Sequence, residues 1–134
     1  MASRSAPHPE RAQLPSATPE SVQNQILARI PAAELAQVLS QAEERWCALR
    51  EELFEQNTEV DVVYFPSTTM VSLIVVLSDG TPIEAMTVGR EGFVGSQLLN
   101  GVTTARYKGV CQIEGTAVVL KSKAFLSIMT AFPL

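Results

Sequence analysis

The chain has 134 residues, of which 46% are hydrophobic and 18% charged, and its formal net charge is -4. This length and composition fit one globular domain whose core needs no metal or disulfide. The negative charge argues against a nucleic-acid surface spread over the chain, because binding phosphates requires a basic face. No apolar run reaches the roughly 18–20 residues of a membrane span, and the N-terminus lacks the apolar segment of a signal peptide. We therefore expect a cytoplasmic protein whose two cysteines, Cys47 and Cys111, are reduced core residues.

The N-terminal part of the chain divides into a tail and two helices. Residues 1–19 contain four prolines with several serines and alanines, which predicts a disordered tail. The folded domain is expected over residues 20–134. Thr18 followed by Pro19 is typical of a helix start, and Pro31 predicts the end of this helix and the beginning of a second one. The second helix is predicted by an apolar stripe at helical spacing, namely Leu35, Val38, Leu39 and Ala42.

From residue 45 onward the hydrophobic pattern has the period of two that is typical of β-strands. The strands are expected at residues 45–50, 52–55, 59–66, 70–78, 82–88, 107–115 and 116–122. Asp79-Gly80 predicts a two-residue hairpin with a type I′ turn, and Glu114-Gly115 predicts another turn. Short strands at regular spacing favour a β-sandwich or jelly roll. A closing helix is predicted over residues 121–132.

The residue types disfavour an enzyme. The only histidine, His8, lies in the predicted tail, so a cupin-type metal site lacks its ligands and a catalytic serine lacks its base. Two cysteines are too few for an iron–sulfur cluster. Glu84 and Glu91 are near the glycine-rich segment and have the chemistry of an acid–base pair, but such positions are more often solvated side chains.

The segment "VGREGFVGS", residues 88–96, holds Gly89, Gly92 and Gly95. Glycines this dense indicate a sharp bend or a close approach of the backbone to another group. The spacing differs from that of dinucleotide-binding and Walker loops. From these residues alone, a corner between two strands and a ligand-binding loop both remain open.

The order of the motifs is more specific than any one of them. The chain contains, in order, "NQILARIPAAEL", "ELFEQN", "VYFPSTTMVSLIVVLSDG", "VGREGFVGSQLLNG" and "VCQIEGTAVVLKSKAF". Over residues 24–134 this series resembles the sensor domain of the Crp/Fnr transcriptional regulators, which is similar to the cyclic-nucleotide-binding domain. The resemblance implies a mainly β, double-stranded β-helix jelly roll with flanking helices and a non-enzymatic effector-sensing role. In the family a dimerisation helix and a DNA-binding helix-turn-helix domain follow. Because the sequence ends at "MTAFPL", we expect a truncated regulator without its DNA-binding domain.

The resemblance also implies a ligand site. In cyclic-nucleotide-binding members the phosphate-binding segment reads Phe-x-Gly-Glu, with an arginine ten residues after the glutamate. Here Phe93 and Gly95 match, Ser96 replaces the glutamate, and Arg106 matches the arginine. The ligand-binding residues implied are Gly95, Ser96, Arg106 and Tyr107, with no metal.

The ligand that the resemblance implies is a cyclic nucleotide or another small anionic effector. The serine argues against tight cyclic-nucleotide binding, because losing a charged hydrogen-bond partner costs about 1.5–3 kcal/mol. A domain without any effector therefore remains open.

An alternative interpretation is a ligand-free module for protein interaction or homodimerisation. It would use apolar residues of the last helix that the missing following helix leaves partly exposed. These residues are Phe125, Ile128, Met129 and Phe132.

Overall fold

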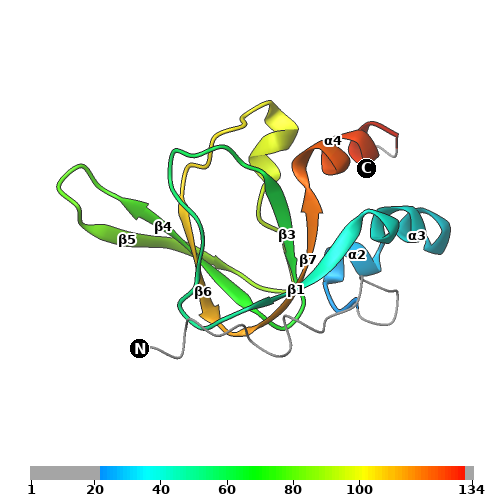
Figure 1. The fold of residues 1–134 in the computed structure, drawn as a ribbon, viewed down its shortest axis with the longest axis horizontal. Helices are drawn as coiled ribbons and strands as arrows, with labels where there is room; N and C mark the ends of the chain where they lie inside the picture. The colour runs from blue at the N-terminus through cyan, green and yellow to red at the C-terminus, as the bar shows by residue number, and fades with distance from the viewer. Residues whose placement is uncertain (1–21, 132–134) are drawn as a thin grey trace.

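The computed structural model of the protein describes residues 22–131, and in them seven strands form two antiparallel sheets. The first sheet has the order β1 (Ala42–Cys47), β7 (Gly115–Lys121), β3 (Val62–Pro66). The second has the order β2 (Glu52–Phe54), β6 (Lys108–Ile113), β4 (Met70–Val76), β5 (Pro82–Val88). The β4–β5 hairpin projects from one side of the body (Figure 1). The predicted two-sheet jelly roll is confirmed.

Three α-helices lie together on the side opposite the β4–β5 hairpin (Figure 1). They are α2 (Gln25–Ala28), α3 (Ala32–Ser40) and α4 (Ser122–Ala131). A 3-10 helix, η3 (Ser96–Asn100), follows the glycine-rich segment and touches α4. None of the helices within residues 22–131 has the length and apolar character needed to cross a membrane.

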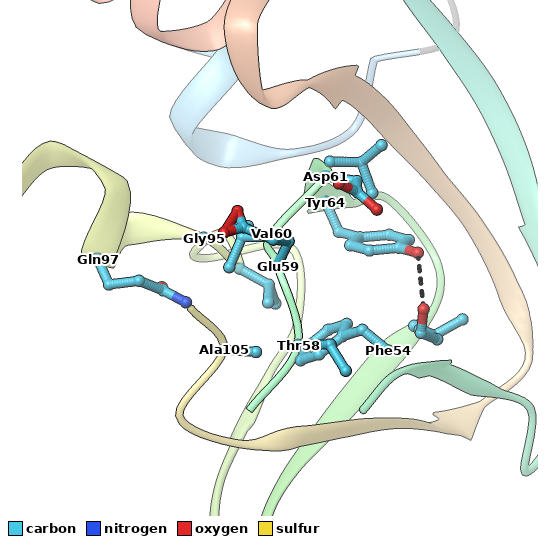
Figure 2. Close-up of a pocket in the computed structure, with 12 residues that line it drawn as sticks. Phe54, Thr58, Glu59, Val60, Asp61, Tyr64, Gly95, Gln97 and Ala105 are labelled. Carbon is cyan, nitrogen blue, oxygen red and sulfur yellow. Dashed lines mark hydrogen bonds between the residues drawn. The ribbon is translucent and has the colours of Figure 1, made fainter. Parts of the chain in front are cut away.

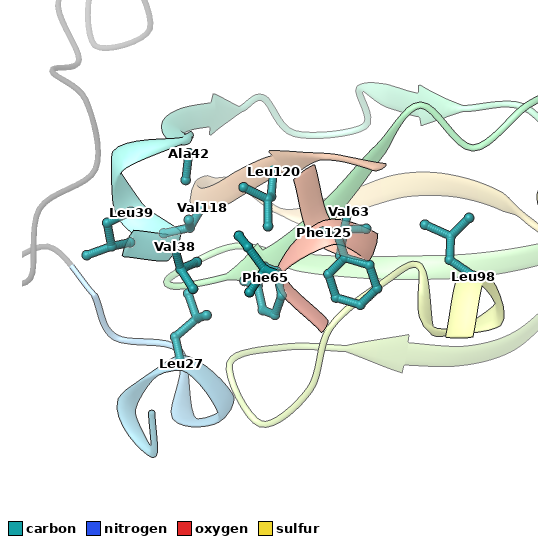
Figure 3. Close-up of a cluster of buried hydrophobic side chains, with 11 residues drawn as sticks. Leu27, Val38, Leu39, Ala42, Val63, Phe65, Leu98, Val118, Leu120 and Phe125 are labelled. Carbon is teal, nitrogen blue, oxygen red and sulfur yellow. The ribbon is translucent and has the colours of Figure 1, made fainter. Parts of the chain in front are cut away.

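The first sheet separates two hydrophobic cores. The core between this sheet and the helices contains Leu27, Val38, Leu39, Ala42, Val63, Phe65, Leu98, Val118, Leu120, Phe125 and Ile128 (Figure 3). The core between the sheets contains Cys47, Tyr64, Val71, Leu73, Val88, Val94, Cys111 and Ala117. Along β3, Val63 and Phe65 therefore face one core and Tyr64 faces the other, as the period of two predicts.

Asn24 fixes the start of the first described helix. This side chain is fully buried, and its Oδ1 accepts hydrogen bonds from the amides of Ile26 (2.9 Å) and Leu27 (3.2 Å). Its Nδ2 donates to the carbonyls of Pro66 (2.9 Å) and Gly92 (2.8 Å). One side chain thus joins α2, the end of β3 and the glycine-rich segment. The predicted helix start at residues 18–19 and the predicted tail lie outside the described residues.

The boundary between the second helix and the first strand differs from the prediction. We expected Ala42 in the helical stripe and a strand over residues 45–50, but α3 ends at Ser40 and β1 spans Ala42–Cys47. Ala42 pairs with Leu120 of β7. The apolar spacing suits a helix as well as a strand here, so pairing with β7 decides the outcome.

The predicted type I′ turn at Asp79-Gly80 is wrong, although both flanking strands are confirmed. Gly80 has φ of 90°, whereas Asp79 is not among the residues with positive φ. The Leu77 amide donates to the Thr81 carbonyl (2.9 Å), and the Gly80 amide donates to the Leu77 carbonyl (2.8 Å). The loop therefore has three residues, 78–80, with glycine at the last position, which is the next most common hairpin connection.

The closing helix is confirmed as α4, but the exposure expected for Phe125 and Ile128 is wrong. Phe125 is 2% exposed and Ile128 is 6% exposed. The Phe125 ring packs near Phe65, with ring centroids 6.4 Å apart. These two side chains complete the core under the helices, whereas Met129 is partly exposed, as expected. Phe132 lies outside the described residues.

Among the strands of residues 22–131, β5 is an edge strand that pairs with β4 alone. All its residues except Val88 are exposed, and Ile83 and Met86 are each 49% exposed. Glu84 lies between them and accepts a hydrogen bond from the Ser72 hydroxyl at 3.0 Å. The projecting hairpin thus exposes two large apolar side chains to solvent and also carries one carboxylate.

Asn24→Ala should lower the free energy of unfolding by about 2–4 kcal/mol. The substitution removes a helix cap and leaves two buried carbonyls without their donor. Urea denaturation measures the loss. Gln25→Ala, at the neighbouring exposed position, is the control and should change stability by less than about 0.5 kcal/mol. Equal stability of the two variants would contradict this role of Asn24.

The buried thiols give a pH-dependent prediction. Cys47 and Cys111 are free and fully buried, and burial raises the pKa of the Cys47 thiol from 9.0 to about 11. The folded state therefore keeps the thiol proton to a higher pH than the unfolded state does. The contribution of Cys47 to the free energy of unfolding is complete below pH 9 and declines as the pH rises toward 11.

We expect the stability advantage of the wild type over Cys47→Ala to shrink by about 1–3 kcal/mol across this pH range. Chemical denaturation at several pH values measures it. Gln112→Ala, at an exposed position, should keep a constant difference from the wild type. An advantage that grows with pH would refute the assignment.

Candidate ligand site

A cavity of about 310 Å³ lies between the two sheets, beside the glycine-rich segment. This volume is at the lower end of the range for small-molecule sites. Its apolar lining consists of Leu53, Phe54, Val60, Val62, Tyr64, Val94 and Ala105. Its polar lining consists of Thr58, Glu59, Asp61 and Gln97, and Gly95 completes the wall (Figure 2). The cavity thus combines an apolar interior with a polar edge.

Two aromatic rings form part of the interior. The centroids of Phe54 and Tyr64 are 6.1 Å apart, with their planes tilted by 32°. The Tyr64 hydroxyl donates to the Leu53 carbonyl at 3.4 Å, which turns it toward β2 (Figure 2). The Arg45 guanidinium lies 5.8 Å from the Tyr64 ring centroid and pairs with the Glu51 carboxylate, and neither of these two residues lines the cavity.

Backbone pairing between distant segments builds one wall. The Asn57 amide donates to the Ala105 carbonyl (2.7 Å), and the Ala105 amide donates to the Thr58 carbonyl (2.8 Å). The Val60 amide donates to the Thr103 carbonyl (2.8 Å). Residues 57–60 and 103–105 are therefore held together by the main chain, so the position of Glu59 and Asp61 at the edge does not depend on side-chain contacts.

At residue 95 both the backbone conformation and the close packing require glycine. Its φ is 124°, which residues with a side chain rarely adopt, and it precedes the first residue of η3. A Cβ atom at this position would approach Val63 Cγ2 to 3.0 Å. Glycine is therefore needed for the chain to pass close to β3 and enter η3.

The first part of the glycine-rich segment is a turn. The Gly92 amide donates to the Gly89 carbonyl at 3.2 Å, and the Glu91 carboxylate accepts from the Gly89 amide at 3.1 Å. This hydrogen bond from Gly89 lowers the pKa of Glu91. Glu91 thus stabilises a turn, and neither Glu91 nor Glu84 lines the cavity.

The structure brings only part of the sequence-predicted site to the cavity. Gly95 lines it, and Arg106 follows the lining residue Ala105 but is itself exposed and not part of the lining. Ser96, the first residue of η3, is also exposed and outside the lining. Tyr107 is partly buried against the core between the sheets.

Sequence reasoning missed Glu59, Asp61 and Gln97 as lining residues. A signal was present for the first two, because two carboxylates spaced by two residues directly precede an apolar strand. Gln97 had no distinguishing signal, since its position depends on the entry into η3.

Comparison with known protein families and with curated proteins finds no match. Solved structures do match the fold. The N-terminal domain of a transcriptional regulator from Streptomyces coelicolor has a TM-score of 0.68 at 18% identity, over 84% of this chain and 80% of that chain. A cyclic nucleotide-binding-like protein from Brucella abortus has a TM-score of 0.64 at 20% identity, over 79% of this chain and 90% of that chain.

A more distant protein has the same architecture. The regulatory subunit of a cAMP-independent protein kinase A from Trypanosoma cruzi, bound to guanosine, has a TM-score of 0.71 at 14% identity. The match covers 81% of this chain and 39% of that one. The chain therefore has the cyclic-nucleotide-binding-like jelly-roll fold, a mainly β two-sheet sandwich with flanking helices.

Proposed function

We propose that this domain is the effector-sensing, non-catalytic module of a Crp/Fnr-type transcriptional regulator. In this proposal a small-molecule effector binds in the cavity between the sheets. The observation that carries it is the cavity beside Gly95, because the segment over residues 93–106 resembles the phosphate-binding segment of the regulators. The match to the N-terminal domain of a transcriptional regulator supports the assignment.

The contacts around η3 supply a route from the cavity to the rest of the domain. Gly95 and Gln97 line the cavity, whereas Leu98 of the same segment is 4% exposed and belongs to the core under the helices. That core also contains Phe125 of α4, and η3 touches α4. A ligand that shifts η3 would therefore disturb the packing of α4, the last element described.

The fold does not determine the charge of the effector. Guanosine, which the T. cruzi protein binds, is a nucleoside without a phosphate. Of the four residues implied by the resemblance, Gly95 forms part of the cavity wall. Contacts from Ser96, Arg106 and Tyr107 to an anionic effector stay a prediction from the resemblance.

Titration of the isotope-labelled protein followed by NMR tests the proposed site. The probes are cyclic AMP, guanosine and 2-phenylethylamine, which represent an anionic, a neutral and a cationic ligand. We expect at least one of them to shift the amide resonances of Gly95 and Ala105 in a saturable way. The absence of shifts with all three probes at high millimolar concentration would contradict the proposal.

Thr58→Trp should weaken, by about tenfold or more, the binding of any probe that shifts Gly95 and Ala105, because the indole would fill the edge of the cavity. Thr58 is exposed, so the fold should tolerate the change. Gln112→Trp places the same ring at an exposed position outside the lining and should leave the affinity unchanged. Equal affinities for the two variants would place the ligand elsewhere.

A further inference from the structure

The charges around the cavity carry information about its ligand. The lining contains two acidic residues, Glu59 and Asp61, and neither lysine nor arginine. Both residues line the cavity, and Figure 2 shows Glu59 near Gly95 and Asp61 near Tyr64. An anion bound here would meet two like charges and no lining cation, which disfavours it, whereas a cation would gain from the same arrangement.

Within residues 22–131, none of the nearest basic side chains forms an ion pair with Glu59 or Asp61. Arg106 is exposed and outside the lining, and Arg45 is already paired with Glu51. Lys121 and Lys123 line a neighbouring hollow that shares Glu59 and Asp61. Within residues 22–131, however, no ion pair joins either lysine to these carboxylates. Both carboxylates therefore remain available to a charged ligand.

The interior of the cavity selects for an apolar body. Leu53, Val62 and Val94 contribute aliphatic surface, and the Phe54 ring offers an aromatic face. Aromatic rings attract organic cations as well as apolar groups, which adds to the effect of the carboxylates. Gln97 is the remaining polar group on the η3 side, and its amide can accept from or donate to a ligand.

We propose that the effector is an amphipathic organic cation, with an aromatic or aliphatic body between the sheets and an amine at Glu59 and Asp61. This inference rests on the proposed function and names the ligand class of the same cavity. It departs from the anionic effector that the resemblance implies, because Arg106 does not line the cavity and two carboxylates do.

A matched series of three probes tests the charge preference: 2-phenylethylamine, 2-phenylethanol and 3-phenylpropionate. They share the phenylethyl body and differ in a positive, neutral or negative end. NMR titrations give the dissociation constants from the shifts of Gly95 and Ala105. We expect the amine to bind about tenfold more tightly than the alcohol, and the carboxylate to bind most weakly. Added salt should weaken only the amine.

Two substitutions connect this preference to the residues that carry it. Glu59→Gln and Asp61→Asn should each weaken amine binding about two- to fivefold, because both carboxylates are exposed to solvent. Neither substitution should change the affinity for 2-phenylethanol. Glu114→Gln removes the same charge at an exposed position outside the lining and serves as the control.

The outcomes separate this inference from the proposed function. Tightest binding of cyclic AMP or 3-phenylpropionate, lost in Arg106→Ala, would overturn the cationic ligand but support effector binding in the cavity. Equal affinities for the three phenylethyl probes would likewise overturn only the charge preference. The absence of cavity shifts with any probe, including cyclic AMP and guanosine, would overturn both proposals.

Discussion

The burial of the first sheet on both faces is the constraint on which the rest of the structure depends. In β7, Val118 and Leu120 pack against the helices, whereas Ala117 packs against the second sheet. Such a sheet must be apolar on both faces, and it fixes where the helices and the second sheet can lie. The short helices α2 and α3 depend on this contact, because isolated helices of their length are marginal in water.

The cavity follows from how the core between the sheets ends. Near η3 the lining includes Gly95, which has no side chain, and Ala105, whose side chain is a single methyl group. The backbone pairing of residues 57–60 with 103–105 prevents the walls from closing further. The same segments that leave the space open also present carboxylates at its edge. The path of the main chain around the open end of the sandwich therefore determines both the shape of the cavity and the charge at its edge.

Much of this fold could be predicted from the sequence, because β3 and β4 are short apolar runs of strand length and α4 has a clear helical stripe. The position of Ala42 in a strand instead of a helix could not be predicted, because its pairing partner Leu120 is distant in sequence. For the site, only Gly95 was both predicted from the motif and found in the lining. Thr58, Glu59 and Asp61 come from one segment and Gln97 from another, and only the tertiary fold brings the two together, so the pair of carboxylates alone could not identify the cavity.

The projecting hairpin has a consequence for behaviour at high protein concentration. An exposed edge strand with apolar side chains is a template for self-association into larger sheets. In β5 Glu84 directly follows Ile83, and Ser72 of the neighbouring strand β4 holds its carboxylate on the sheet. A charged side chain on an edge strand disfavours the addition of another strand, so Glu84 protects this hairpin against aggregation.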